Sequence, residues 1–109
     1  MSCVPLEKLE LRPMASGSNA LVLTEQVSWE AFPQYVRDFS SLLCVPPPEP
    51  ISSFDVQIAS LEIDGQRFWL ACDIWFDGVN LEPQNDLAAA LIADIRERLQ
   101  LLREAPGRE

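Results

Sequence analysis

The strongest constraint on the fold lies between Phe54 and Asp73, where apolar and polar residues alternate on both sides of the dipeptide Asp64-Gly65. An Asp-Gly pair between two alternating runs is typical of a two-residue hairpin turn, because both positions tolerate positive φ angles. A turn at this place also determines the register of the two strands and sets Glu62 opposite Arg67. The chain is therefore expected to contain an antiparallel hairpin.

This register divides the side chains of the hairpin between two faces. One face is apolar and is expected to lie on the core: Ala59, Leu61, Ile63, Phe68, Leu70 and Cys72. The other face is mostly polar: Ser60, Glu62, Arg67, Trp69 and Asp73. One apolar and one polar face are typical of an antiparallel sheet that is covered on a single side.

The residues upstream of the hairpin alternate out of step with its core-facing residues. Phe54, Val56 and Ile58 are apolar, but they have the opposite parity. A shift of one residue moves a side chain to the other face of a sheet. The sequence therefore predicts a β-bulge or a strand break near Ala59 and Ser60.

Two amphipathic helices are expected, one on each side of the hairpin. The first begins at Ser28, whose hydroxyl can cap a helix, and ends before the Pro-rich segment 45–53. We interpret that segment as a stiff crossover to the sheet, with a ligand for an SH3-type domain as the alternative. The second helix follows Asn85, a preferred N-cap residue, and carries an apolar stripe that Ile92 widens: Leu87, Leu91, Ile95, Leu99 and Leu102.

Short strands at 6–11, 20–24 and 79–81 complete the expected elements. Their order in the chain is strand, strand, helix, two or three strands, helix. This order predicts an α+β two-layer sandwich, with an antiparallel sheet of about four to five strands and two helices on one face. The 109 residues fit a single domain over 1–109, with fraying expected at 1–5 and 104–109.

The charge of the chain is strongly negative. It has 8 Lys and Arg against 17 Asp and Glu, a formal net charge of −9. Between Asp55 and Asp94 eight acidic residues accompany a single base, Arg67. Such a surface repels nucleic-acid phosphates and anionic lipid, so neither nucleic acid nor membrane is an expected partner. The charge serves solubility in the simplest interpretation, and attraction of a basic partner in the alternative.

The sequence also indicates where the protein works. No run of about 18 apolar residues could span a bilayer, and charges near the start leave no apolar signal-peptide segment. Three cysteines form neither an even disulfide set nor a C-x-x-C pair. A cytoplasmic location is therefore expected.

Residues for catalysis and metal binding are scarce. The chain has no histidine, and its 4 scattered glycines form no phosphate-binding loop. The carboxylates of Asp73, Asp77, Glu82 and Asp86 could in principle perform acid–base chemistry, but acids in a dense acidic segment are typically solvated surface groups. We therefore expect no enzyme activity, no cofactor and no metal site.

The segment from Trp69 to Glu82 is the candidate partner-binding site. It combines aromatic residues with acidic ones, which is typical of interface anchors surrounded by steering charge. The alternative is that the rings of Trp75 and Phe76 fold back over a second small cluster. The candidate residues are Trp69, Asp73, Trp75, Phe76, Asp77 and Glu82.

Two motifs carry a resemblance that covers about Thr24 to Leu102. They are Val27-Ser28-Trp29-Glu30-Ala31-Phe32 and Asp77-Gly78-Val79-Asn80-Leu81-Glu82-Pro83. In them the chain resembles small acidic bacterial proteins of unknown function, some of which are grouped with toxin-immunity proteins. The resemblance implies a protein that blocks a basic nuclease or another toxin by charge complementarity. It transfers no individual site residues.

Three functions follow as hypotheses. The first is a non-catalytic protein-binding domain of immunity or inhibitor type, which has an acidic face and whose protein partner is basic if the charge serves binding. The second is a structural or assembly subunit that forms a homodimer through the sheet face around Trp69. The third, an enzyme that uses carboxylates, requires a carboxylate pair with a raised pKa in a pocket.

Overall fold

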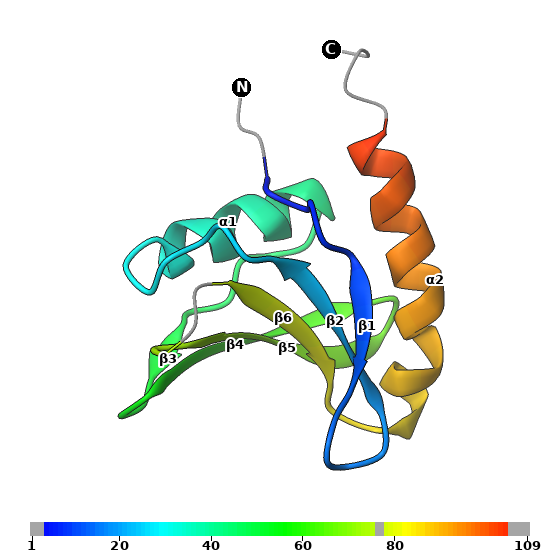
Figure 1. Ribbon diagram of the computed structural model, residues 1–109. Helices are drawn as coiled ribbons and strands as arrows, with labels where there is room; N and C mark the ends of the chain where they lie inside the picture. Colours follow the sequence, from blue (N-terminus) through cyan, green and yellow to red (C-terminus); the bar gives the residue numbers. More distant parts are fainter. Residues whose placement is uncertain (1–3, 76–77, 105–109) are drawn as a thin grey trace.

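An antiparallel sheet of six strands carries two helices on one of its faces (Figure 1). The arrangement comes from a computed structural model, which describes residues 4–75 and 78–104. The strands lie in the spatial order β1-β2-β6-β5-β4-β3. The elements follow along the chain as β1 (Glu10–Pro13), β2 (Asn19–Thr24), α1 (Phe32–Leu42), β3 (Ile51–Ser52), β4 (Val56–Ile63), β5 (Gln66–Asp73), β6 (Val79–Pro83) and α2 (Asp86–Arg103).

The predicted α+β sandwich is confirmed, with six strands in place of the expected four to five. The additional strand is β3, which lies inside the segment 45–53 that was expected to be a crossover and which pairs with β4. Strands predicted at 20–24 and 79–81 are confirmed as β2 and β6. The strand expected at 6–11 is wrong in its first part, because Leu9 has a φ of 46° in the left-handed region and β1 begins only after it.

The predicted hairpin is confirmed residue by residue. Asp64 and Gly65 have φ angles of 53° and 82°, and Glu62 lies opposite Arg67. The pairing of β4 with β5 runs without interruption from Val56 to Ile63, so the predicted bulge is wrong. A register shift is found instead in the pairing of β2 with β6.

The side chain of Gln57 explains the wrong expectation of a bulge. It lies on the core-facing side of β4, where its exposed fraction is 4%, and its amide donates a hydrogen bond to the carbonyl of Trp29 at 2.7 Å. Its apolar neighbours Val56 and Ile58 lie on the opposite face of the strand. Apolar alternation at this end of β4 therefore marks the face that the helices do not cover.

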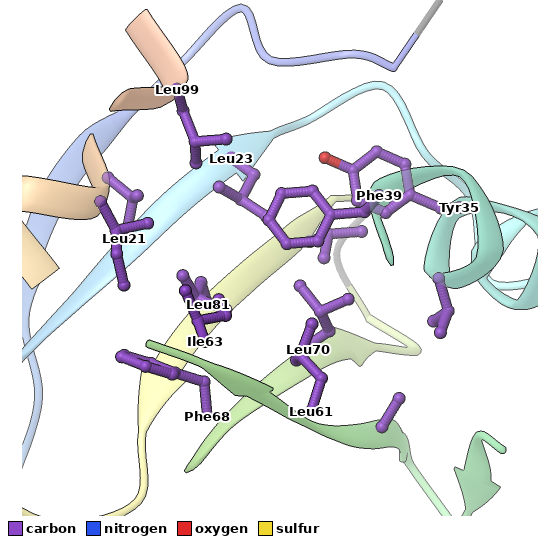
Figure 2. Packing of buried hydrophobic residues seen from close by; sticks show 14 of the residues in the cluster. Leu21, Leu23, Tyr35, Phe39, Leu61, Ile63, Phe68, Leu70, Leu81 and Leu99 are labelled. Carbon is purple, nitrogen blue, oxygen red and sulfur yellow. The ribbon is translucent and has the colours of Figure 1, made fainter. Parts of the chain in front are cut away.

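The hydrophobic core lies between the sheet and the two helices (Figure 2). β4 and β5 contribute the side chains that the hairpin register predicted, Cys72 among them, and β2 and β6 add Leu21, Leu23 and Leu81. Burial of one such side chain contributes about 1.5–3 kcal/mol. The core therefore holds the helical layer to one face and leaves the other face of the sheet without a helix over it in the described part of the chain.

The first helix begins later than predicted. α1 starts at Phe32 with Ala31 as its N-cap residue, whereas Ser28 accepts the N–H of Ala31 in the preceding turn at 3.3 Å. Pro33 is the reason. In a helix capped by Ser28 its missing N–H would be needed for a helical hydrogen bond, but as the second helical residue it leaves no bond unmade.

The second helix begins where the sequence predicts, and Ile92, Ile95 and Leu99 of the expected apolar face are buried, but at the first turn the buried residue is Ala88 and not Leu87. Asn85 is the N-cap, and its side chain accepts the N–H of Ala88 at 2.8 Å. Leu87 is 67% exposed, whereas Ala88 is fully buried. The buried stripe comprises Ala88, Ile92, Ile95 and Leu99.

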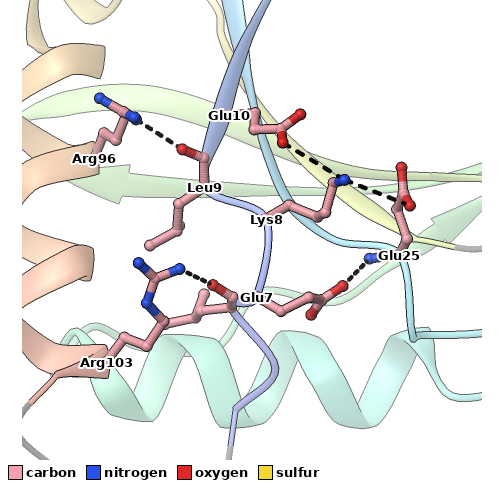
Figure 3. Close-up of polar contacts among 8 residues, drawn as sticks. Glu7, Lys8, Leu9, Glu10, Glu25, Arg96 and Arg103 are labelled. Atoms are coloured by element: carbon pink, nitrogen blue, oxygen red, sulfur yellow. Dashed lines mark hydrogen bonds and ion pairs between the residues drawn. The ribbon is translucent and has the colours of Figure 1, made fainter.

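Long side chains hold the segment before β1 in place (Figure 3). Arg96 and Arg103 of α2 donate hydrogen bonds to the carbonyls of Leu9 and Leu6, at 2.7 and 3.0 Å. The hydroxyl of Tyr35 in α1 donates to the carbonyl of Pro5 at 2.8 Å. Fraying was predicted for 1–5 and 104–109, of which 1–3 and 105–109 lie outside the described residues. Pro5 is held by this bond from Tyr35, and the N–H of Glu104 donates to the carbonyl of Gln100 at 3.0 Å. Neither of the described helices combines the length with the hydropathy that a membrane-spanning segment needs.

Candidate functional site

The face of the sheet opposite the helices, here called the outer face, carries the predicted site. One row of cross-strand neighbours crosses all six strands on this face and is mostly apolar: Ile51, Ile58, Ala71, Asn80, Val22 and Glu10. Because β strands alternate their side chains, every second residue of β5 joins this face as well. The outer face therefore combines an apolar row with polar groups beside it.

Two of the predicted residues lie next to each other on this face. Trp69 of β5 is directly opposite Glu82 of β6, and Ser60 of β4 is opposite Trp69 on its other side. Trp69 is 37% exposed, as expected for the less buried face of the hairpin. The sheet register thus makes a neighbouring pair of two residues that are thirteen positions apart in the sequence.

Two other predicted residues lie at the far end of β5. Asp73 is four residues from Trp69 on the same face, which corresponds to roughly 13 Å along a strand. Its carboxylate accepts the N–H of Trp75 at 2.8 Å. Trp75 is 74% exposed, so its ring does not fold back over a buried cluster. Phe76 and Asp77, the remaining predicted residues, lie outside the described residues.

Four exposed hydrophobic residues gather at this end of the sheet, and only Trp75 of them was among the predicted site residues. The N–H of Ile74 donates to the carbonyl of Asp55 at 2.9 Å, which places the turn between β3 and β4 beside the end of β5. Phe54 lies in that turn and is 94% exposed. We call the cluster the apolar tip: Ile51, Phe54, Ile74 and Trp75.

A signal for the apolar tip is present in the sequence. The parity of Phe54, Val56 and Ile58 places these residues on the face opposite the core side of the hairpin. This parity led to the expectation of a bulge, because apolar residues normally lie in the core. The structure places Ile58 on the outer face, next to Ile51.

Two hollows on the outer face contain the described residues of the predicted site. The first, the Trp75 hollow, has a volume of about 570 Å³ and is lined by Arg12, Thr24, Ala71, Asp73, Trp75 and Asn80, among others. The second, the Trp69 hollow, has a volume of about 480 Å³ and is lined by Met14, Trp69, Glu82, Gln84, Asn85 and Asp86, among others. The predicted site is thus divided between two hollows, one at Trp69 in the middle of β5 and one at the end of that strand.

The carboxyl group of Glu82 is unusual in this setting. Burial raises its pKa above the ordinary value of 4.5, because a charged carboxylate loses water contacts there. Burial is the cause of this shift.

Asp73 and Asp55 place negative charge beside the apolar tip, and Glu82 places it beside Trp69. Arg67 lies on the outer face too, but it pairs with Glu62 at 3.9 Å. The outer face thus offers aromatic groups with acidic neighbours at two places. Among the described residues, no group of three or more His, Cys, Asp or Glu could hold a metal ion.

Comparison with known proteins does not assign the chain to a family. The chain matches no protein-family model, no curated protein and no solved structure at a significant level.

Proposed function

We propose that this chain is a non-catalytic protein-binding domain that binds its partner through the outer face of the sheet. The observation that carries the proposal is the apolar tip, in which Phe54 and Trp75 expose 94% and 74% of their surface next to the apolar row. Exposed apolar groups in such a cluster cost solubility unless a partner covers them. Aromatic residues are also the commonest anchors of protein interfaces.

The dimensions of the domain are sufficient for such an interface. A standard protein interface covers about 800 Å² on each partner. The domain measures 38 × 31 × 24 Å along its principal axes, and all six strands share the outer face. A partner that contacts both the apolar tip and Trp69 would bury an area of this order.

The charge of the domain favours a basic partner of the kind that an immunity or inhibitor protein blocks. The net charge is −9, and Asp55, Asp73 and Glu82 lie beside the exposed aromatic residues. Complementary charge accelerates association and selects among partners. Cytoplasmic action is part of the proposal, supported by the exposed free thiol of Cys44, which suits a reducing compartment.

Site-specific photo-cross-linking tests the proposal. A photoreactive phenylalanine analogue replaces Trp75 in one variant and Leu101 in a matched control. Leu101 is similarly exposed, at 69%, but belongs to α2 in the helical layer. In cells that naturally produce the protein, we expect a discrete cross-linked species from position 75 and none of that mass from position 101. Equal products from both positions, or none from position 75, would contradict the proposal.

A homodimer that covers the apolar tip is the second candidate. It is favoured by the four exposed side chains of the apolar tip, because an isologous interface would bury this set on both subunits. Multi-angle light scattering at increasing protein concentration decides between the two. A monomer at all concentrations excludes the dimer, whereas a dimer that dissociates in a Trp75→Ser variant but persists in Leu101→Ser supports it.

A further inference from the structure

The Trp69 hollow has a composition that differs from the rest of the outer face. Trp69 forms part of its wall, Met14 adds a polarizable apolar group, and Glu82 and Asp86 supply carboxylates. None of the described residues that line it is a Lys or an Arg. A hollow with an aromatic ring, a thioether and uncompensated negative charge is complementary to a cation that also has an apolar portion.

We propose that the Trp69 hollow receives a basic side chain, an arginine or a lysine, of the protein that binds the outer face. The proposal rests on the proposed function and names the chemistry of the partner at one position. The aliphatic part of the basic side chain packs against Trp69 and Met14, and its charged head pairs with the carboxylate of Glu82, while Asp86 adds negative charge to the same hollow.

The partial positive charge at the N-terminus of α2 does not prevent a cation from binding in the Trp69 hollow. Asn85 and Asp86 begin α2, and the N-terminus of a helix carries about half a positive charge. The side chain of Asn85 already caps the N–H of Ala88. Glu82 and Asp86 together contribute up to two full negative charges, so the net field in the hollow still favours a cation.

The half-buried position of Glu82 supports the same occupant. Burial disfavours its charged form, and a cation nearby would restore the electrostatic stabilisation that water no longer supplies. Gln84 does not fill this role, because its amide nitrogen donates to Ser60 and to the carbonyl of Phe68, at 2.8 and 3.2 Å. Arg67, a base on the same face, is paired with Glu62.

The experiment uses the full chain, isotopically labelled, and follows the indole N–H signals of its three tryptophans by NMR. Trp→Phe variants assign the signals of Trp29, Trp69 and Trp75. The probe is arginine blocked as its Nα-acetyl amide, and the control is citrulline blocked in the same way, which has the same shape without the charge. We expect saturable shifts of the Trp69 signal with a dissociation constant of about 1–10 mM for the arginine probe only.

Two charge-neutralising variants locate the binding site. Glu82→Gln is expected to weaken binding of the arginine probe about fivefold or more, as for a lost charge-assisted contact. Glu97→Gln changes the net charge equally on the exposed side of α2 and is expected to leave the affinity unchanged. Equal effects of the two variants, or equal binding of arginine and citrulline, would overturn the proposal.

A blocked Leu-Arg-Leu tripeptide distinguishes a protein partner from a free small cation. Its leucines can contact apolar groups of the outer face beside the hollow, so we expect it to bind about threefold tighter than blocked arginine, or better. Equal affinity of the two probes would assign the hollow to a small free cation and overturn the assignment to a protein side chain. If none of the probes binds, the proposal for the Trp69 hollow is also overturned. The cross-linking at position 75 does not depend on these probes, so the two proposals can be contradicted independently.

Discussion

Glu7 accepts a hydrogen bond from the buried hydroxyl of Thr24 at 2.7 Å, and this contact joins the segment before β1 to the end of β2. The second carboxylate oxygen of Glu7 accepts the N–H of Glu25, also at 2.7 Å (Figure 3). Both donors therefore point at one carboxylate. Thr24 also lines the Trp75 hollow, so the contact supports one wall of the candidate site.

The variant Glu7→Gln should lose this arrangement, because a glutamine offers one acceptor oxygen where two donors must be satisfied. We expect a loss of about 1 kcal/mol in the free energy of unfolding at neutral pH, a modest value because Glu7 remains partly in contact with water. Urea denaturation measures it. Glu10→Gln is the control in the same segment, since its exposed ion pair with Lys8 contributes little.

The pH dependence gives this prediction a second test. Burial opposes ionisation of Glu7, but the hydrogen bonds from Glu25, from Thr24 and from its own N–H, together with the charge of Lys8, outweigh it and lower the pKa below the ordinary 4.5. A lowered pKa in the folded state adds stability above the unfolded value, which is lost as the pH falls through the folded value. The difference between wild type and Glu7→Gln should therefore be smaller at acidic pH, below this lowered pKa, than at neutral pH. A constant difference at both pH values would contradict the assignment.

Gly78 sits where the chain passes against the end of β2 and leads to a second prediction. A Cβ at this position would lie 2.5 Å from the carbonyl oxygen of Thr24, and the φ of 126° is unfavourable for other residues. Gly65 also has a positive φ, 82°, but nothing lies within 4 Å of the position that a Cβ would take there. Gly65→Ala should therefore lose about 1 kcal/mol from backbone strain alone.

Gly78→Ala should lose about 3 kcal/mol or more, because backbone strain and a backbone clash act together. The N–H of Gly78 donates to the carbonyl of Val27 at 2.7 Å, so the chain cannot move away without breaking that bond. Chemical denaturation of both variants measures the difference. Equal losses for the two glycines would show that the approach to Thr24 is not a constraint on the fold.

Local signals in the sequence were sufficient for the hairpin of β4 and β5. The turn residues Asp64 and Gly65 determine the register, and each strand then alternates from that point. The exact face of α2 was not predictable in the same way. Leu87 and Ala88 both fit a helical period, and only the close packing of α2 on β2, β5 and β6 selects the smaller side chain.

The candidate site was predictable only in part for a related reason. Trp69 was correctly placed on the less buried face, because its parity follows from the hairpin turn. That Trp69 and Glu82 lie next to each other depends on the pairing of β5 with β6, which no local signal in the sequence specifies. The exposure of Phe54 was not predicted, because an apolar side chain is normally expected in the core.

Glu82 supplies the last prediction, which links stability to the proposed binding. Its pKa is raised in the folded state, so the folded protein holds a proton that the unfolded chain has released between pH 4.5 and the higher folded value. Stability therefore falls as the pH rises through this window, and the full penalty is present above it. Glu82→Gln removes the ionisable group and should raise the melting temperature at neutral pH by a few degrees.

Below pH 4.5 the two proteins should differ less, because Glu82 is then protonated in both the folded and the unfolded state. Thermal unfolding followed by circular dichroism at both pH values measures the effect, with Glu62→Gln as an exposed control on the same face. A stabilising Glu82→Gln that also loses arginine binding would identify Glu82 as a residue kept for binding at a cost in stability. A destabilised variant at neutral pH would instead mean that the carboxylate is already compensated within the folded domain.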